Sequence, residues 1–99
     1  MQIEFGDEDL RQLYQEAAFR VPAIGPELTK AYRKVVGFID QAEDERDLRE
    51  MKSLHFEKLK GQRDGQHSLA LNDQWRLIIR IERSEDGKTV VVIEIVDYH

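Results

Sequence analysis

The hydrophobic pattern of residues 59–99 predicts three β-strands in succession. Apolar and polar residues alternate over residues 67–71 and 75–82, and a nearly continuous apolar run follows over residues 89–96. The segments are separated by turn-forming residues, Asn72-Asp73 and then the stretch from Ser84 to Lys88. Short apolar segments bounded by such residues are typical of an antiparallel meander.

The N-terminal half has a helical period instead. Asp7 is a good helix N-cap, and the apolar stripe that follows it comprises Leu10, Leu13, Tyr14, Ala17 and Ala18. Pro26 suits the first turn of a second helix, whose stripe comprises Leu28, Ala31, Tyr32, Val35, Val36 and Ile39. Because both tyrosines lie on these stripes, we interpret them as core residues.

Two further segments complete the expected architecture. Residues 2–5 alternate and predict a short edge strand, whereas residues 40–51 are dense in charge. The charged segment fits a solvated helix or loop, with Leu48 and Met51 as its anchors. The element order predicts one α+β domain over residues 1–99, with two to three N-terminal helices on one face of a small, mainly antiparallel sheet.

Strand alternation also predicts which side chains share a sheet face. Arg76, Ile78 and Arg80 are expected on one face, with Ile78 between the two arginines. The opposite face would bury the following residues against the helices: Trp75, Leu77, Ile79 and Ile81. In the last strand, strict alternation places Glu94 with Val90, Val92 and Val96 on one face. It places Asp97 with Val91, Ile93 and Ile95 on the other.

Composition and charge limit the possible functions. The chain has no cysteine and three scattered histidines, so thiolate chemistry and a metal motif are not indicated. No apolar run approaches the ~18 residues of a membrane span, and the N-terminus lacks a signal pattern, so we expect a cytosolic protein. The net charge of −5 argues against general nucleic-acid binding. Residues 52–83 nevertheless carry seven basic and four acidic side chains, a local charge of +3.

Two short stretches suggest chemistry without proving it. Gly61 and Gly65 bracket a connector that is not a P-loop, because the following Lys-Ser/Thr is absent. Lys60 and Arg63 in this region could reach a phosphate. At the chain end stand Asp97, Tyr98 and His99. A histidine titrates near neutrality, although a terminal histidine is usually just solvated.

Considered together, these residues resemble the HigB branch of the RelE/ParE toxin superfamily. The resemblance is carried by a run of motifs over about the last 45 residues of the chain. Its parts are Leu59-Lys60-Gly61, then Arg63, Gly65 and Ser68, then Leu71-Asn72-Asp73 with Trp75-Arg76, and finally the ending Glu94 to His99. The N-terminal half agrees with the family only in element order and length. The family fold is a small α+β domain.

This resemblance implies the toxin of a bacterial type II toxin-antitoxin system. Such toxins enter the ribosomal A site and cut mRNA with no metal or cofactor, and a helix-turn-helix, HigA-like antitoxin neutralises them. In the cleavage the 2′-hydroxyl attacks the adjacent phosphate, which requires proton transfer and cations at the phosphorane. The family motifs imply His99, assisted by Tyr98 and oriented by Asp97, for proton transfer. They imply Arg76 and Lys60 for the phosphate.

Some candidates come from geometry, charge or a departure from the family pattern. Arg63 and Arg80 are added as RNA-binding residues from charge and strand geometry alone. Many family members have a histidine three residues before the motif lysine, where this chain has Glu57; His55, two residues earlier, is the catalytic candidate in its place. His67 stands where the family commonly has an aromatic residue, and we interpret it as a strand residue rather than as a stacking platform.

Two other functions are also compatible with the sequence. ParE-type relatives poison DNA gyrase and are not nucleases, and they would have no use for the Asp-Tyr-His ending. The acidic charge and the displaced histidine also fit a weakened toxin that mainly binds its antitoxin and co-represses the operon.

Overall fold

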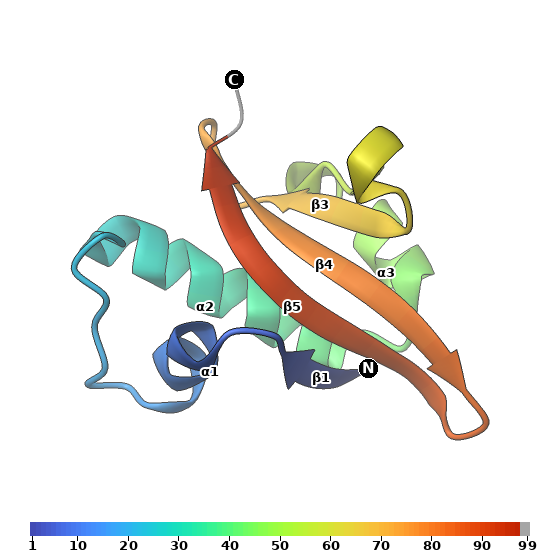
Figure 1. The fold of residues 1–99 in the computed structure, drawn as a ribbon, viewed down its shortest axis with the longest axis horizontal. Coiled ribbons are helices and arrows are strands. Elements are labelled where there is room, and N and C mark those ends of the chain that lie inside the picture. The colour runs from blue at the N-terminus through green and yellow to red at the C-terminus, as the bar shows by residue number, and fades with distance from the viewer. Residues whose placement is uncertain (98–99) are drawn as a thin grey trace.

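A five-stranded sheet with strand order β1-β5-β4-β3-β2 forms one layer of the protein (Figure 1). The computed structural model describes residues 1–97. In it the strands are β1 (Gln2–Phe5), β2 (Glu57–Lys58), β3 (Gln66–Ala70), β4 (Trp75–Ser84) and β5 (Gly87–Asp97). The predicted meander is confirmed, since β3, β4 and β5 pair antiparallel. The predicted edge strand β1 pairs parallel with β5, from Gln2 opposite Thr89 to Phe5 opposite Val92. The sheet is therefore mixed.

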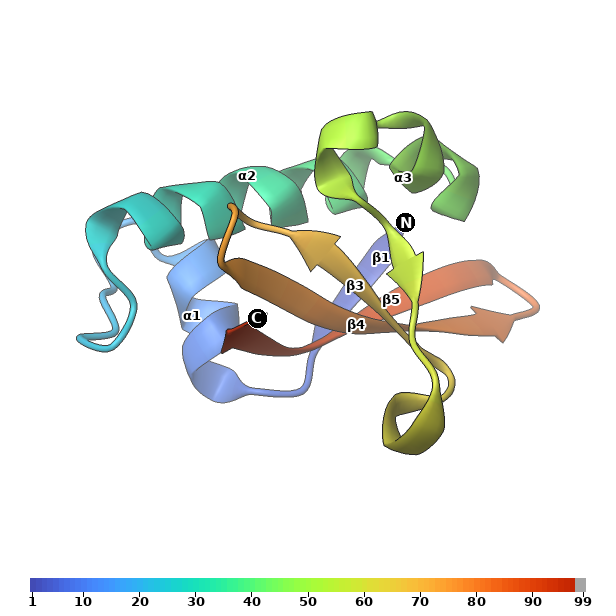
Figure 2. The ribbon, with the colours of Figure 1, turned by 90° about the horizontal axis from the view of Figure 1, so that it is seen from above.

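Three α-helices form the second layer. They are α1 (Glu8–Gln15), α2 (Pro26–Gln41) and α3 (Glu45–Glu50), and two single 3₁₀ turns, η1 (Lys52–Leu54) and η2 (Gly61–Arg63), flank β2. Both predicted helix starts are confirmed: the Asp7 side chain accepts a hydrogen bond from the Leu10 amide at 3.0 Å, and Pro26 opens α2. The α2 and α3 helices lie on one side of the sheet, and the η2 turn lies on the other (Figure 2). This confirms the expected α+β class.

The first helix is shorter than its apolar stripe predicted. α1 ends at Gln15, and Ala17 and Ala18 are exposed in the following loop. The cause is a long-range contact: Arg33 of α2 donates hydrogen bonds to four backbone carbonyls at 2.7–3.3 Å, those of Leu13, Glu16, Ala17 and Phe19. A guanidinium with five donors satisfies these carbonyls outside a helix, so local propensity no longer decides where α1 stops.

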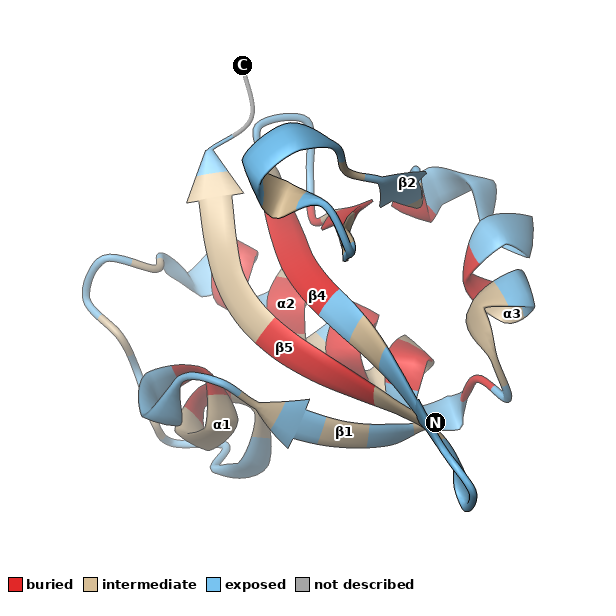
Figure 3. Cartoon of the chain, turned by 45° about the vertical axis from the view of Figure 1, so that its right-hand side comes forward, coloured by how far each residue is buried: buried red, intermediate tan, exposed pale blue. Residues whose placement is uncertain are grey.

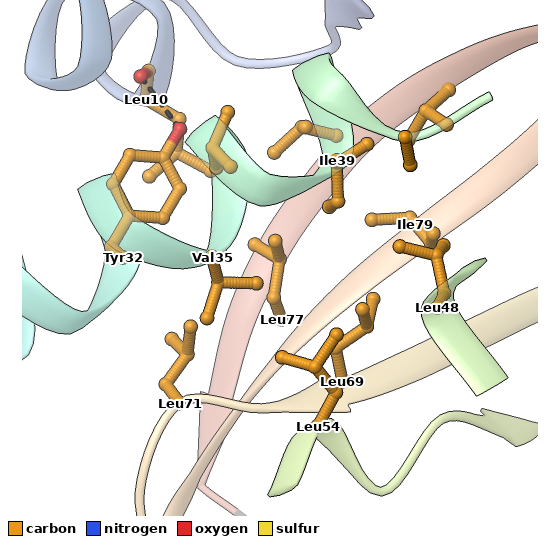
Figure 4. Close-up of a cluster of buried hydrophobic side chains, with 14 of the residues drawn as sticks. Leu10, Tyr32, Val35, Ile39, Leu48, Leu54, Leu69, Leu71, Leu77 and Ile79 are labelled. Atoms are coloured by element: carbon orange, nitrogen blue, oxygen red, sulfur yellow. Dashed lines mark hydrogen bonds between the residues drawn. The ribbon is translucent and has the colours of Figure 1, made fainter. Parts of the chain in front are cut away.

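A single hydrophobic cluster fills the space between helices and sheet (Figure 4). Tyr32 is fully buried in it, and its hydroxyl donates to the Leu10 carbonyl at 2.7 Å, which joins α2 to α1. Burial raises the pKa of the Tyr32 hydroxyl, so this donor stays protonated. Tyr14 packs at the edge of the cluster, 6.0 Å from the Phe5 ring centroid. The interpretation of both tyrosines as core residues is confirmed.

The charge-dense third segment is anchored by one side chain. Leu48 is 0% exposed and is the buried residue of α3, whereas Met51, the other expected anchor, is 41% exposed. Asp44 caps the helix by accepting a hydrogen bond from the Arg46 amide at 2.8 Å. The prediction is therefore correct for Leu48 and wrong for Met51. The chain turns into η1 after Met51 and buries Leu54 instead.

We expect Leu48→Ala to lower the free energy of unfolding by about 2–5 kcal/mol, the usual range for a buried leucine. Met51→Ala is the matched control, because an exposed side chain of similar size should cost less than about 0.5 kcal/mol. Urea denaturation followed by circular dichroism measures both. Equal losses for the two variants would show that α3 is not fixed by Leu48.

Candidate functional site

The sheet face that the helices leave uncovered carries most of the candidate residues, and we call it the open face. On β4, Arg76, Ile78 and Arg80 point to it, while Leu77 and Ile79 enter the core. The predicted alternation of β4 is thereby confirmed. The buried residues of β4 lie in the first half of the strand, and those of β5 lie near its middle (Figure 3). The open face is partly covered by the η2 turn and is not a bare sheet.

A β-bulge in β5 changes the face of one acidic residue. Ile78 pairs with Glu94 and Ile79 pairs with Val92, so Ile93 is an extra residue in β5. The alternation reverses there, and Ile95 packs against the core on the same side as Val92. Glu94 therefore lies on the open face with Arg76, and strict alternation was wrong for this strand. Bulges commonly re-aim a side chain in this way next to functional sites.

Arg76 is held in place at the centre of the candidate site. It is only 7% exposed, and its Nη2 donates a hydrogen bond to the His55 carbonyl. His55 has φ 45° and ψ 53°, a left-handed conformation that is uncommon for a side-chain-bearing residue. The His55 backbone thus orients Arg76, while the His55 side chain is exposed. This hydrogen bond fixes the direction of one arm of the guanidinium.

The two arginines added from charge and geometry are both paired with carboxylates. Arg63 in η2 lies 2.5 Å from Glu94 Oε1 and donates to Gln66 Oε1 at 3.0 Å. Arg80 lies 2.9 Å from Glu82 Oε2. All four charged side chains of these two pairs are 40–49% exposed, and such pairs contribute about 1 kcal/mol or less. An incoming phosphate can therefore replace either carboxylate.

Lys60 differs from the arginines. It is exposed and stands immediately before η2, three residues from Arg63. Within residues 1–97 no hydrogen bond or ion pair of its ammonium group occurs. Lys60 can therefore bind a phosphate without first breaking an ion pair.

Asp97 is the last residue that the structure describes, and its side chain does not lie on the open face. This residue pairs with Trp75 in the β4·β5 ladder, and its Oδ2 accepts a hydrogen bond from Gln74 Nε2 at 3.1 Å. It alternates with Val96, which pairs with Arg76, so Asp97 points to the other side of the strand end from Arg76. Tyr98 and His99 lie outside the described residues.

Residues that the sequence did not identify also belong to this face. Glu94 was assigned to a strand face but given no role, and the structure makes it the ion-pair partner of Arg63. Its one sequence signal is that it interrupts an otherwise apolar run. His67 is confirmed as a strand residue of β3, and it lies on the helix-covered side rather than on the open face. Arg76, Arg63 and Glu94 are thus brought together, with Lys60 on the adjoining turn.

Two solved structures share this fold along essentially their whole length. The YoeB/ParE toxin from Agrobacterium tumefaciens has a TM-score of 0.57 and 15% identity, with 100% of both chains covered. A chain of the YoeB-YefM complex from Staphylococcus aureus has a TM-score of 0.59 and 19% identity, with 100% of this chain and 97% of that chain covered. At these identities the likeness shows the fold alone, a small α+β domain.

The sequence identifies the family within that class. The model of the HigB-like toxin family, described as RelE-like toxin of type II toxin-antitoxin system HigB, matches residues 3–99, and the chain belongs to this family. A comparison with curated proteins gives no match. Among residues 1–97, no helix is both long enough and apolar enough to cross a membrane.

Proposed function

We propose that this toxin is a ribosome-dependent endoribonuclease that cuts mRNA in the A site. The observation that carries the proposal is the fixed Arg76 on the open face, beside the end of β5. A buried guanidinium oriented by a backbone carbonyl is a preorganised donor for a phosphate. Family membership supports the class of target, and the shared fold with the YoeB-type toxins is consistent with it.

The proposed reaction is an internal transesterification. The 2′-oxygen attacks the neighbouring phosphorus as a base removes its proton, and the 5′-oxygen leaves as it gains a proton. The products are a 2′,3′-cyclic phosphate and a 5′-hydroxyl end. Arg76 and Lys60 stabilise the charge on the phosphorane, and Arg63 and Arg80 contribute after exchanging their carboxylate partners for phosphates.

Proton transfer is assigned to the end of the chain. His99 is the main proton-transfer group, Tyr98 assists it, and Asp97 orients or tunes them. His55 contributes through its backbone carbonyl, which positions Arg76. Its exposed side chain stays a catalytic candidate. This assignment needs no metal ion or cofactor.

The partner we propose is a helix-turn-helix, HigA-like antitoxin, in a heteromeric complex. Support comes from the type II toxin family and from the fold shared with a chain of the YoeB-YefM complex. The ribosome and its mRNA are the proposed targets, and both place the action in the bacterial cytoplasm.

The test compares purified protein on mRNA alone, on mRNA in translating ribosomes, and on DNA gyrase. We expect cuts in codon phase only when ribosomes are present, with gyrase supercoiling unchanged. Inhibition of gyrase with intact mRNA would replace the proposal by gyrase poisoning. Tight antitoxin binding with neither activity would leave operon co-repression as the function.

A further inference from the structure

A polar depression lies on the helix-covered side of the sheet, away from the open face. Its volume is about 230 Å³, and side chains from α3, β2, β3 and β4 line it: Glu45, Arg49, Lys58, His67, Ile81 and Arg83. The α3 helix and β2 lie at the same side of the molecule (Figure 3). Because a liquid water occupies about 30 Å³, this depression can hold a group of several heavy atoms. We call it the His67 pocket.

The pocket is positively charged although the chain is acidic. Its lining has three cationic side chains and one carboxylate, a net charge of +2, whereas the whole chain carries −5. The one carboxylate, Glu45, is engaged through Oε1, with Lys88 at 2.7 Å and Arg83 at 3.4 Å, while its buried Oε2 has no hydrogen-bond partner among the described residues. Within residues 1–97, Arg49 and Lys58 form no ion pair. Two cations therefore face the pocket without an acidic partner.

His67 sits between these charges and is held in a fixed plane. Its ring stacks on Phe56 with centroids 4.9 Å apart and planes 4° apart, and Arg49 Cζ lies 5.5 Å from the Phe56 centroid. Burial lowers the pKa of His67, and the charges of Arg49 and Lys58 lower it further, against a smaller effect of Glu45. The buried Nδ1 has no hydrogen-bond partner among the described residues. An anion in the pocket would offset the positive potential around this ring.

We propose that the His67 pocket binds a phosphate group, held by Arg49 and Lys58 with Arg83 at its rim. Arginine and lysine together supply a planar donor fork and a point charge, which suit a multiply charged tetrahedral oxyanion. The phosphate can belong to an RNA chain or to a small molecule. Lys58 stands two residues before Lys60, so β2 separates this pocket from the site on the open face.

The first experiment is an NMR titration of the histidine rings in the purified full chain. Inorganic phosphate is added at constant ionic strength with chloride as the reference, and His67→Gln identifies the resonance. We expect phosphate to raise the apparent pKa of His67, because a bound anion favours the imidazolium. No change relative to chloride would overturn the proposal.

The variants make the test specific. The double variant Arg49→Gln, Lys58→Gln should no longer show the phosphate-induced rise in the pKa of His67. It should also bind phosphate roughly tenfold or more weakly. Lys30→Gln with Lys34→Gln changes the net charge equally on exposed α2 positions and should leave the response intact. Lys58→Gln alone changes an exposed strand residue, and it replaces the Arg49/Lys58 double variant in the test if that variant fails to fold. An equal response in all variants would refute the pocket.

A second arm identifies the source of the phosphate. A short single-stranded RNA with 2′-O-methyl groups cannot be cut, and its affinity is measured against salt concentration without ribosomes. If RNA supplies the phosphate, the Arg49/Lys58 pair variant binds RNA more weakly, and its salt slope is smaller by about 0.7 for each phosphate that it no longer neutralises. If only inorganic phosphate or a mononucleotide raises the pKa of His67, the pocket holds a small ligand. Neither result depends on the proposed cleavage activity.

Discussion

Deleting Asp97, Tyr98 and His99 is expected to abolish mRNA cleavage and to relieve growth arrest in a bacterial host. The assigned proton-transfer groups are removed together, and general acid–base catalysis typically contributes about 10²–10⁴-fold to a rate. The single variant His99→Ala should lose much of the same rate enhancement. The readouts are growth after induction and mapping of mRNA 5′ ends, compared with the intact chain.

The shortened chain should still fold. The β4·β5 ladder runs from Ser84 opposite Gly87 to Trp75 opposite Asp97, so the deletion removes only its last pair. Retained antitoxin binding is the control that separates lost chemistry from lost structure. If the shortened protein arrests growth as strongly as the intact one, the catalytic assignment is wrong. Arrest without any mRNA cleavage in both forms would indicate the gyrase-type activity.

Replacing Arg76 with lysine should reduce cleavage about 10²–10³-fold, the range observed when one preorganised transition-state donor is removed. Lysine keeps the charge but lacks the planar fork that reaches the His55 carbonyl and a phosphate together. The part-buried His55 carbonyl then loses this donor, so the free energy of unfolding should fall by about 0.5–1.5 kcal/mol. Single-turnover cleavage on ribosomes and urea denaturation measure the two effects separately.

Arg33→Lys is the matched control for Arg76→Lys. Arg33 also donates to backbone carbonyls, but these belong to α1 and the loop after it. This variant should lose stability while the cleavage rate per folded molecule stays unchanged. If both variants lose activity only in proportion to their stability, Arg76 is a structural residue and not a phosphate ligand.

The sequence predicted best what local periodicity decides. The meander and the two faces of β4 follow from a period of two residues, and the starts of α1 and α2 follow from Asp7 and Pro26. The features it missed depend on distant contacts. The end of α1 is decided by Arg33, twenty residues after Leu13, and the parallel pairing of β1 by a strand from the other end of the chain.

In the candidate site too, some features follow from local periodicity and others depend on distant contacts. Alternation alone placed Arg76 and Arg80 on one face, but it gave no sign that Arg76 is buried under the His55 backbone. The bulge at Ile93 adds one residue to β5 and leaves no signature in an apolar run, so the position of Glu94 could not be predicted. The pairing of Arg63 with Glu94 therefore became visible only in three dimensions.

The place of β5 in the sheet has a consequence for how this protein is made. β1 and β4 both pair with β5, and Gln2 of β1 pairs with Thr89, 87 positions later. During synthesis β1 therefore has no partner until nearly the whole sequence up to β5 has been translated. Long-range pairing of this kind slows folding. The ribosome must therefore translate the chain as far as β5 before the sheet can be completed.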